Sequence, residues 1–393
     1  MKQLQNYQHT IYASYLGYIT QAIVNDFAPL LFLTFSREFS LTLDKITLIT
    51  TINFAVQLIV DFLSARLIDR IGYRISITAA HFFAGAGLLG LGLFPSLFRD
   101  PYTGILIAVV LYAIGGGLIE VLISPIVEAC PTEQKETAMS LLHSFYCWGE
   151  VGVILLSTLF FWIAGITSWR IISCIWAIVP LINLVYFTMV PLYPIVPEGK
   201  SLGVLQLVRN RAFWWAFVLM ICAGASEQAM CQWASTFAES ALHVAKTAGD
   251  LLGPCAFAVL MGISRAFYGK HGERIRLKTM MLASALLCVA CYALAAFTQT
   301  PLFGLLGCAF CGLSVGIFWP GTFSMASARI PAGGTAMFAL LALAGDLGCS
   351  GGPTMVGLIA NAAGDDLRKG LLAAVLFPLV IVCCLITGSG KQA

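Results

Sequence analysis

The chain has 393 residues, of which 59% are hydrophobic and only 10% are charged, and its formal net charge at pH 7 is +3. So few charged side chains cannot coat a water-soluble globule of this size, which excludes a soluble globular protein. The composition therefore predicts a protein whose main solvent is a lipid bilayer, and the small net charge gives no indication of a nucleic-acid partner.

The hydrophobic residues form runs that are long enough to cross a bilayer, which takes about 20 helical residues. Because the runs are apolar all round, they predict an all-α membrane protein with about 12 transmembrane helices. The first run is too long for a cleaved signal peptide, so the first helix is expected to stay in the mature protein. The predicted spans are 11–35, 45–68, 73–94, 103–128, 138–164, 168–191, 211–238, 249–269, 276–298, 301–328, 333–361 and 368–388.

The cations predict the orientation of these spans. When the loops are assigned alternately to the two sides, most Lys and Arg residues, Arg265 among them, fall on one side. That side should be cytoplasmic, which puts both termini inside and predicts a multi-pass protein of the plasma (inner) membrane. Asp61 lies near a cytoplasmic helix end, where it could pair with Arg66 or Arg70.

The first and fourth predicted spans each contain an acid deep in an apolar run, Asp26 in 11–35 and Glu120 in 103–128. A carboxylate in hydrocarbon is costly and usually marks an ion or substrate path. Because burial disfavours the charged form, such an acid can bind and release a proton. We interpret both as proton-coupling residues, and the alternative is that each acid only pins two helices together.

The segment between the second and third spans carries an ordered pattern of charges, Ala-Arg-Leu-Ile-Asp-Arg-Ile-Gly-Tyr-Arg, from Ala65 to Arg74. It resembles the signature loop of the major facilitator superfamily, G-x-L-x-D-R-x-G-R-K, with Ala65 in place of the first glycine. The resemblance implies a transporter and assigns Asp69, Arg70, Gly72 and Arg74 to the gate or signature loop.

Three short segments are similar to the fucose/glucose/galactose proton symporters within that superfamily. They are the Asn-Asp pair that ends at Asp26, the fourth-span segment that starts at Glu120, and 141–149. Ser124 replaces the asparagine of those symporters, and His143 stands where they usually have glutamine. The resemblance implies proton coupling and sugar binding at Asp26 and Glu120, and both departures bear on which substrate hydroxyls are recognised.

A polar interruption divides the predicted spans into six and six. Charged loops recur after the second span of each half, and a proline lies inside the fourth span of each half, at Pro125 and Pro320. These features predict two pseudo-symmetric six-helix halves that rock about a central site. The predicted parts are an N-terminal bundle 1–191, a cytoplasmic linker 192–210 and a C-terminal bundle 211–393.

The seventh predicted span is unusually polar. Gln228 and Gln232 are four residues apart and share one helix face, next to Trp233. Amides can hydrogen-bond to sugar hydroxyls and an indole can stack on the apolar sugar face, whereas the alternative is hydrogen bonding between helices. Asn53 and Gln57 have the same spacing on the second span.

Further acids in apolar runs, including Glu150, exceed what a neutral sugar requires and would suit a cationic or zwitterionic substrate. Glycines around Asp346 predict that the eleventh helix is broken or flexible there, which could line a substrate cavity or form a hinge without ligand contact. The predicted substrate-binding residues are Asn25, Asn53, Gln57, His143, Trp148, Glu227, Gln228, Gln232, Trp233, Trp319 and Asp346.

Two cofactor-like patterns are rejected. Paired cysteines at 288–291 and 308–311 have zinc-site spacing, but they lie in apolar helical runs where small side chains pack helices. A glycine pattern at 85–90 matches the dinucleotide fingerprint without a preceding strand. We therefore predict no metal, no cofactor and no enzymatic activity.

Together these features predict a monomeric transporter that works by alternating access. The expected activity is proton-coupled uptake of a small polar solute such as a sugar. The alternative is a proton-driven transporter or exporter of a cationic or zwitterionic solute such as an amine, amino acid, peptide or drug.

Overall fold

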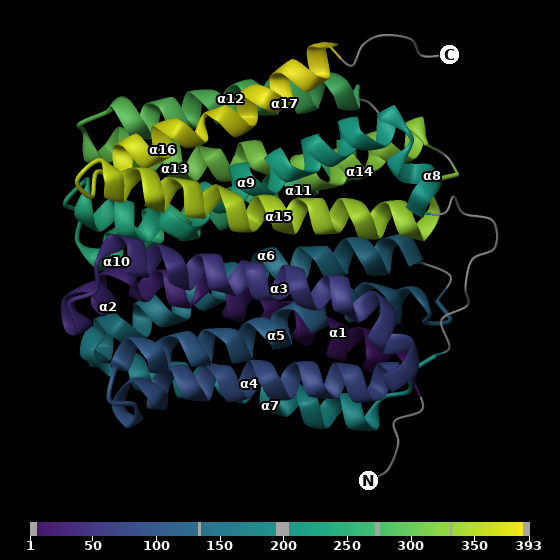
Figure 1. Cartoon of the computed structure of the whole chain (residues 1–393), viewed down its shortest axis with the longest axis horizontal. Coiled ribbons are helices and arrows are strands. Elements are labelled where there is room, and N and C mark those ends of the chain that lie inside the picture. The colour runs from purple at the N-terminus through teal and green to yellow at the C-terminus, as the bar shows by residue number, and fades with distance from the viewer. Residues whose placement is uncertain (1–5, 133–134, 194–203, 272–275, 331, 388–393) are drawn as a thin grey trace. The chain divides into compact units, whose positions relative to one another are not determined.

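The structure is a computed structural model that describes residues 6–132, 135–193, 204–271, 276–330 and 332–387. The chain forms two compact units, Met1–Val196 and Pro197–Ala393. Each unit is a bundle of long helices (Figure 1).

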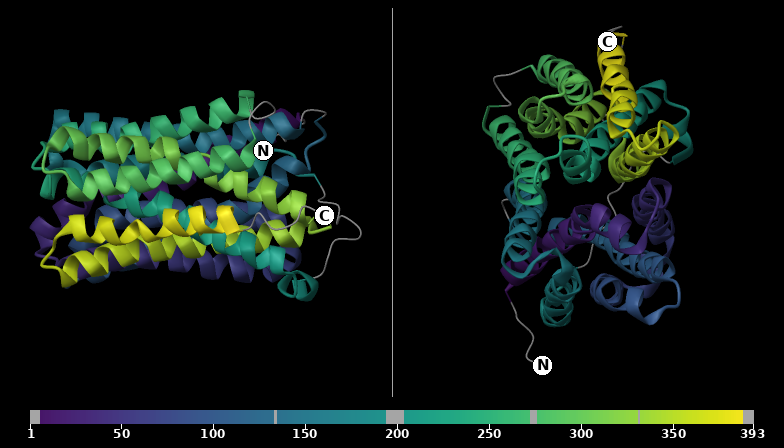
Figure 2. Two further views of the ribbon diagram at one scale, coloured as in Figure 1. Left: turned by 90° about the horizontal axis from the view of Figure 1, so that it is seen from above. Right: turned by 90° about the vertical axis from the view of Figure 1, so that its left-hand side faces the viewer.

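Unit 1 contains seven α-helices and two short 3₁₀ segments among its described residues. Within it, α4 packs against both α5 and α7 (Figures 1 and 2). The elements are α1 Tyr7–Asp26, η1 Ala28–Leu31, α2 Phe32–Phe39, α3 Leu43–Ile71, α4 Tyr73–Leu97, α5 Pro101–Glu128, α6 Lys135–Ala164, η2 Ile166–Ser168 and α7 Trp169–Met189.

Unit 2 is built in the same way, and α9 packs against α15 along much of its length (Figure 1). A short helix, α8, lies in the part of the predicted linker 192–210 that the structure describes. The elements are α8 Val204–Val208, α9 Arg211–Ser240, α10 Lys246–Asp250, the π-helical η3 Leu251–Cys255, α11 Ala256–His271, α12 Leu277–Phe297, α13 Pro301–Val315, α14 Phe318–Arg329, α15 Gly334–Ala362, α16 Leu367–Ala374 and α17 Leu376–Thr387.

Eleven helical segments of the described residues are long and apolar enough to cross a membrane. The 29-residue helix α15 adds a further long helix to these. The predicted all-α membrane fold with about 12 transmembrane helices is therefore confirmed.

The first span is longer than predicted and changes helix type directly after Asp26. It runs from Tyr7 to Phe39, as α1, the 3₁₀ segment η1 and α2. Pro29 has no N–H to donate to the carbonyl of Asn25, and the N–H of Leu30 turns to Phe27 O at 3.2 Å. The regular α-helical ladder therefore stops where the polar pair Asn25-Asp26 lies.

The eleventh span is not broken, contrary to the prediction. Helix α15 is continuous from Gly334 to Ala362, and several of its glycines serve close packing. A Cβ at Gly348 would collide with the carbonyl oxygen of Ile221 on α9, and one at Gly352 would lie 2.6 Å from Ala225 O. Because glycine removes these clashes, the two helix backbones approach closely.

The prolines of the two fourth spans behave differently. Pro125 lies inside α5, which continues to Glu128, whereas Pro320 follows the interruption that separates α13 from α14. Proline cannot donate to the carbonyl one turn earlier, which for Pro320 is that of Gly316 in the interruption. The tenth span is therefore interrupted at the carbonyl that the proline leaves without its helical partner.

Candidate functional site

The polar side chains of unit 1 gather where α1, α3, α5 and α6 meet. Asn25 and Asp26, the last two residues of α1, are 7% and 4% exposed. Gln21 precedes Asn25 by four residues, so the two amides share a helix face. Buried polar groups of this kind need hydrogen-bond partners, which the neighbouring helices supply.

Four amides form a connected cluster between α1 and α3. Gln57 Nε2 donates to Asn25 Oδ1 at 2.9 Å and to Asn53 Oδ1 at 3.0 Å. Asn53 Nδ2 donates to Asn25 Oδ1 at 3.3 Å, and Gln21 Nε2 donates to Gln57 Oε1 at 2.9 Å. Three of the predicted substrate-binding residues, Asn25, Asn53 and Gln57, are therefore brought together.

One end of this amide cluster reaches Glu120 on α5. Gln21 Nε2 donates to Glu120 Oε2 at 3.1 Å. A carboxylate oxygen of Asp61 on α3 lies within 4.8 Å of one of Glu120. Asp61 is thus next to a second acid, while the side chains of Arg66 and Arg70, its suggested partners, lie outside what the structure describes.

The other end of the cluster reaches Asp26. Asn25 Nδ2 donates to the hydroxyl of Tyr146 on α6 at 3.4 Å, and that hydroxyl donates to Asp26 Oδ2 at 3.5 Å. Glu150, four residues after Tyr146 and 1% exposed, has a carboxylate oxygen within 4.8 Å of one of Asp26. The two acids of interest are therefore joined through side chains of a single unit, and each has a second carboxyl beside it.

Two pairs of carboxyls in unit 1 lie close enough for one member of each pair to hold a proton. Two unit charges 4.8 Å apart repel by about 3.5 kcal/mol at an effective dielectric constant of 20. Two carboxyls held this close inside a protein therefore favour the state in which one of them keeps a proton. Asp26 with Glu150, and Glu120 with Asp61, are two such pairs.

The replacement Gln57→Leu tests whether the amide cluster matters. The leucine removes two donors and one acceptor, so Asn25 and Asn53 lose buried partners and the free energy of unfolding should fall by about 1–3 kcal/mol per lost partner. For the proton-coupled transport that the sequence predicts, we also expect the number of protons carried per solute to fall. Thermal unfolding of the purified protein and paired proton and solute flux measurements check the two effects.

Asn183→Leu is the matched control for this prediction. Asn183 is a fully buried amide of the same unit that bonds to Ala13 O at 3.0 Å and to His81 Nε2 at 2.8 Å, outside the cluster. It should lose stability and keep the proton-to-solute ratio. If Gln57→Leu also keeps that ratio, the cluster only holds helices together.

His143 and Ser124, the two departures from the symporter pattern, both lie beside Tyr18. The Tyr18 hydroxyl is 3.0 Å from Ser124 Oγ, and its ring centroid is 5.4 Å from that of His143. His143 is exposed on α6, and Trp148 on the same helix is 53% exposed. Tyr18 thus contacts both residues at which this chain departs from the symporter pattern.

In unit 2, Glu227 on α9 faces a cation that the sequence placed in a loop. Arg265 lies inside α11, six residues before its last residue, His271, and its Nη2 is 3.5 Å from Glu227 Oε2. The placement of Arg265 among loop cations was wrong, because α11, like the predicted span 249–269, extends past it. The ion pair partly offsets the excess of buried acids that the sequence indicated.

Two further polar residues of α9 form hydrogen bonds within unit 2. Gln232 Nε2 donates to Gln228 Oε1 at 3.1 Å on the same helix. Trp233 is fully buried, and its indole Nε1 donates to Pro353 O on α15 at 2.9 Å. That bond is an interhelical contact of the kind given as the alternative to sugar stacking.

Trp319 and the α15 segment that carries Asp346 lie close together in unit 2. Asp346 is 6% exposed on α15, and the indole of Trp319 on α14 lies against the backbone of the preceding residue, Gly345. Glycine at 345 therefore leaves the room that the indole occupies. The structure brings Trp319 to the segment that carries Asp346.

The signature segment is almost entirely helical. Helix α3 ends at Ile71, α4 begins at Tyr73, and Gly72 between them has φ +93°, a conformation that glycine adopts without strain. The side chains of Asp69 and Arg70 lie outside what the structure describes. A one-residue turn thus replaces the expected loop.

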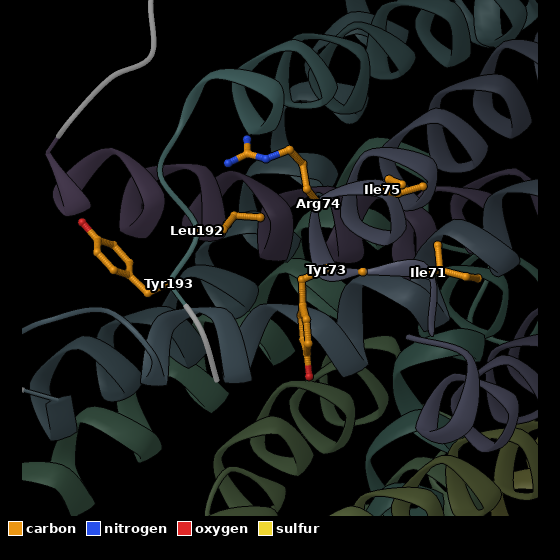
Figure 3. A pocket seen from close by; sticks show the side chains of 7 residues that line it. Ile71, Tyr73, Arg74, Ile75, Leu192 and Tyr193 are labelled. Carbon is orange, nitrogen blue, oxygen red and sulfur yellow. The ribbon is translucent and has the colours of Figure 1, made fainter. Parts of the chain in front are cut away.

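Arg74 caps the end of α7. Its guanidinium donates to Phe187 O at 2.9 Å, Thr188 O at 3.1 Å and Val190 O at 3.0 Å, carbonyls that the helix itself leaves without partners. Beside it, Tyr73, Leu192 and Tyr193 line a hollow of about 480 Å³ (Figure 3). The signature arginine therefore fastens α4 to α7.

The site contains four polar residues that the sequence did not assign to it: Gln21, Tyr146, Tyr18 and Arg265. The helical period could have indicated two of them. Gln21 lies one helical turn before Asn25, and Tyr146 one turn before Glu150, so both positions follow from a period of about four. Tyr18 and Arg265 carried no comparable pattern. Arg265 was assigned from loop alternation alone, which cannot detect a cation inside a helix.

Comparisons with known proteins agree with this architecture. The profile described as Major Facilitator Superfamily matches residues 14–353. Comparison with curated proteins gives no match.

Solved structures of similar fold cover nearly the whole chain. The fucose:proton symporter FucP of E. coli is 16% identical, with 97% of this chain and 98% of that chain covered and a TM-score of 0.68. A bacterial homolog of the human lysosomal transporter Spinster is 14% identical, with 97% and 96% covered and a TM-score of 0.77. The nucleoside transporter NupG is 13% identical, with 96% and 99% covered and a TM-score of 0.77.

Proposed function

The chain belongs to the major facilitator superfamily of membrane transporters, and from this we propose that it is a proton-coupled symporter of a small hydroxyl-bearing solute such as a sugar. Alternating access between two helical units is the mechanism we propose for it.

The observation that carries the proposal is the buried pair Asp26 and Glu150, whose carboxylate oxygens lie within 4.8 Å. One proton relieves the repulsion between two such acids, and its loss restores that repulsion. Binding and release of the proton therefore change the free energy of the site, which is what a coupled transporter requires.

The second pair, Glu120 and Asp61, is coupled to the first through the amides. An ionised Glu120 accepts from Gln21 Nε2, whereas a protonated Glu120 becomes a donor and needs an acceptor. Gln21 Oε1 is buried and has no hydrogen bond among the described residues, so it is available for that role once the amide turns. Such a turn also breaks the bond from Gln21 to Gln57 and so alters the rest of the cluster.

The class of solute follows from the same amides. Asn25, Asn53 and Gln57 offer both donors and acceptors, which suits hydroxyl groups that also do both. Fucose and nucleosides, the solutes in the names of two proteins of similar fold, both carry several hydroxyls. Together these support a neutral, hydroxylated part in the solute.

A second candidate is proton-driven export of a cationic or zwitterionic solute. It is favoured by the buried acids Asp26, Glu150 and Asp346, which could pair with an ammonium group. Against it, Arg265 already neutralises Glu227 in unit 2. We therefore place import of a hydroxylated solute first.

The cation distribution supports a plasma-membrane location with both termini cytoplasmic. We propose a monomer as the transporting species, in which one chain supplies both units.

Uptake into proteoliposomes tests the proposed function. Purified protein is given labelled fucose, galactose or uridine under an inward acid gradient, an inward sodium gradient, or no gradient. We expect at least one of these solutes to accumulate only under the acid gradient. Accumulation that needs sodium would refute proton coupling, and extrusion of amines with no uptake of hydroxylated solutes would support the second candidate.

A further inference from the structure

A short helix with an uncovered apolar side lies at the end of unit 2 where α9 begins. This helix, α8, packs on α9 and α15 (Figure 1). Its residue Leu207 is fully buried, whereas Leu205 and Val208 are 66% and 39% exposed. The helix thus buries one leucine against the bundle and leaves other apolar side chains uncovered.

The first turn of α9 fixes the level of α8 relative to a bilayer. Helix α9 has 30 residues, so it is about 45 Å long and exceeds the apolar core of a bilayer, which is about 30 Å thick. Its first residue, Arg211, is exposed, and a guanidinium is costly in hydrocarbon. That first turn therefore lies among the lipid headgroups, and α8, which ends three residues earlier, lies at the same level.

Trp214 on α9 extends the apolar side of α8. Its indole Nε1 donates to Val208 O at 2.7 Å, a carbonyl at the C-terminus of α8 that the helix itself leaves without a partner. The side chain is 47% exposed, and its ring centroid lies 5.2 Å from that of Phe217, one turn further into the membrane span. Tryptophan is enriched at membrane interfaces. We call Leu205, Val208 and Trp214 the interfacial patch, which is continuous with the apolar surface of α9.

Positive charge surrounds the interfacial patch. Arg209 and Arg211 flank Asn210, the N-cap of α9; both are exposed, and neither forms an ion pair with a described residue. Arg329, the last residue of α14, lies at the same end of unit 2 with its guanidinium over Trp215. The described acids of unit 2 lie in the middle of helices or at the opposite end, and they are Glu227, Glu239, Asp250, Asp346, Asp365 and Asp366.

We propose that α8 is a membrane-surface helix that binds an anionic phospholipid. The interfacial patch enters the boundary between headgroups and acyl chains, and Arg209 and Arg211 bind the negatively charged headgroup. A soluble phosphate would use only the arginines, whereas an anionic lipid uses the arginines and the patch together. The bound lipid holds the start of unit 2 at the membrane surface. This site is separate from the proposed transport function and does not depend on it.

Lipid binding to the purified full chain in a neutral detergent tests this inference. The probes are phosphatidylglycerol, phosphatidylcholine with the same acyl chains, and glycerol 3-phosphate, which has the phosphate without the chains. We expect phosphatidylglycerol to bind most tightly. Its binding should weaken when the ionic strength is raised from about 0.01 M to about 0.1 M, because the range of the attraction shortens from about 30 Å to about 10 Å.

Two double variants assign the effect to the arginines. Arg209→Gln/Arg211→Gln should weaken phosphatidylglycerol binding by about 25-fold, because each arginine near an anionic surface contributes about fivefold, and should leave phosphatidylcholine binding unchanged. Arg276→Gln/Lys278→Gln is the matched control. It removes two cations at the start of α12, at the same end of unit 2 but outside α8 and its flanking residues, and should bind phosphatidylglycerol like the wild type.

A single variant tests the interfacial patch. Leu205→Ser should weaken the binding of both lipids by about tenfold, because the serine loses the burial of an apolar side chain, and should leave the dependence on ionic strength unchanged. Thermal unfolding without added lipid verifies that each variant is folded.

Equal binding of phosphatidylglycerol by the wild type and Arg209→Gln/Arg211→Gln would overturn the inference. An equal loss in Arg276→Gln/Lys278→Gln would do the same, because total charge and not this site would then attract the lipid. Glycerol 3-phosphate that binds as tightly as phosphatidylglycerol would identify a soluble phosphate as the ligand and refute the lipid. Since transport is not measured, failure of the proposed symport leaves these outcomes unchanged.

Discussion

Asp26→Asn should abolish uphill accumulation of the solute and leave exchange of labelled for unlabelled solute intact. The amide cannot bind a proton and cannot repel Glu150, so the free-energy difference between the loaded and unloaded states is lost. Across a gradient of one pH unit, one coupled proton supports up to about a tenfold concentration ratio. In the variant we expect that ratio to fall to one, measured in proteoliposomes with and without the gradient.

Asp365→Asn is the matched control for this change. It makes the same substitution at an exposed position with φ +64°, where asparagine is tolerated as well as aspartate. It should keep the full accumulation ratio. Undiminished uphill uptake by Asp26→Asn would remove Asp26 from the coupling mechanism.

Gly348→Val should have the largest effect on stability. Its Cβ would meet the carbonyl oxygen of Ile221 and lie 2.8 Å from the amide nitrogen of Ala225, and backbone atoms of α9 cannot turn aside as a flexible side chain could. The helices α9 and α15 must separate, which also weakens the bond from Trp233 to Pro353. We expect a loss of about 3 kcal/mol or more in the free energy of unfolding, seen as a lower unfolding temperature and poor recovery of folded protein.

Gly351→Val, three residues further along α15, provides the control. A Cβ at Gly351 meets nothing within 4 Å, so the same substitution in the same helix should change the unfolding temperature little. Similar destabilisation by both variants would mean that helix propensity, and not the contact with α9, explains the effect of Gly348.

The interpretation of glycine illustrates where sequence reasoning fails. The glycines around Asp346 fit a break in the eleventh helix as well as they fit close packing, because glycine permits both. The nearby backbone of α9 decides between them, and that neighbour is more than a hundred residues away in the chain. At Pro29 the error was the reverse. The first span was predicted as one unbroken helix, although the proline marks the place where its α-helix is interrupted.

The sequence by itself determined the long apolar helices and the positions of Asp26 and Glu120 within them, because hydropathy and length depend only on neighbouring residues. It also indicated that Asn53 and Gln57 share a face, since that follows from the helical period. Only the tertiary structure decided which charges meet. Glu150 beside Asp26, Asp61 beside Glu120 and Arg265 beside Glu227 depend on how each helix is rotated against its neighbours. In an apolar interior, that rotation determines whether a carboxyl shares a proton with a second acid or pairs with a cation.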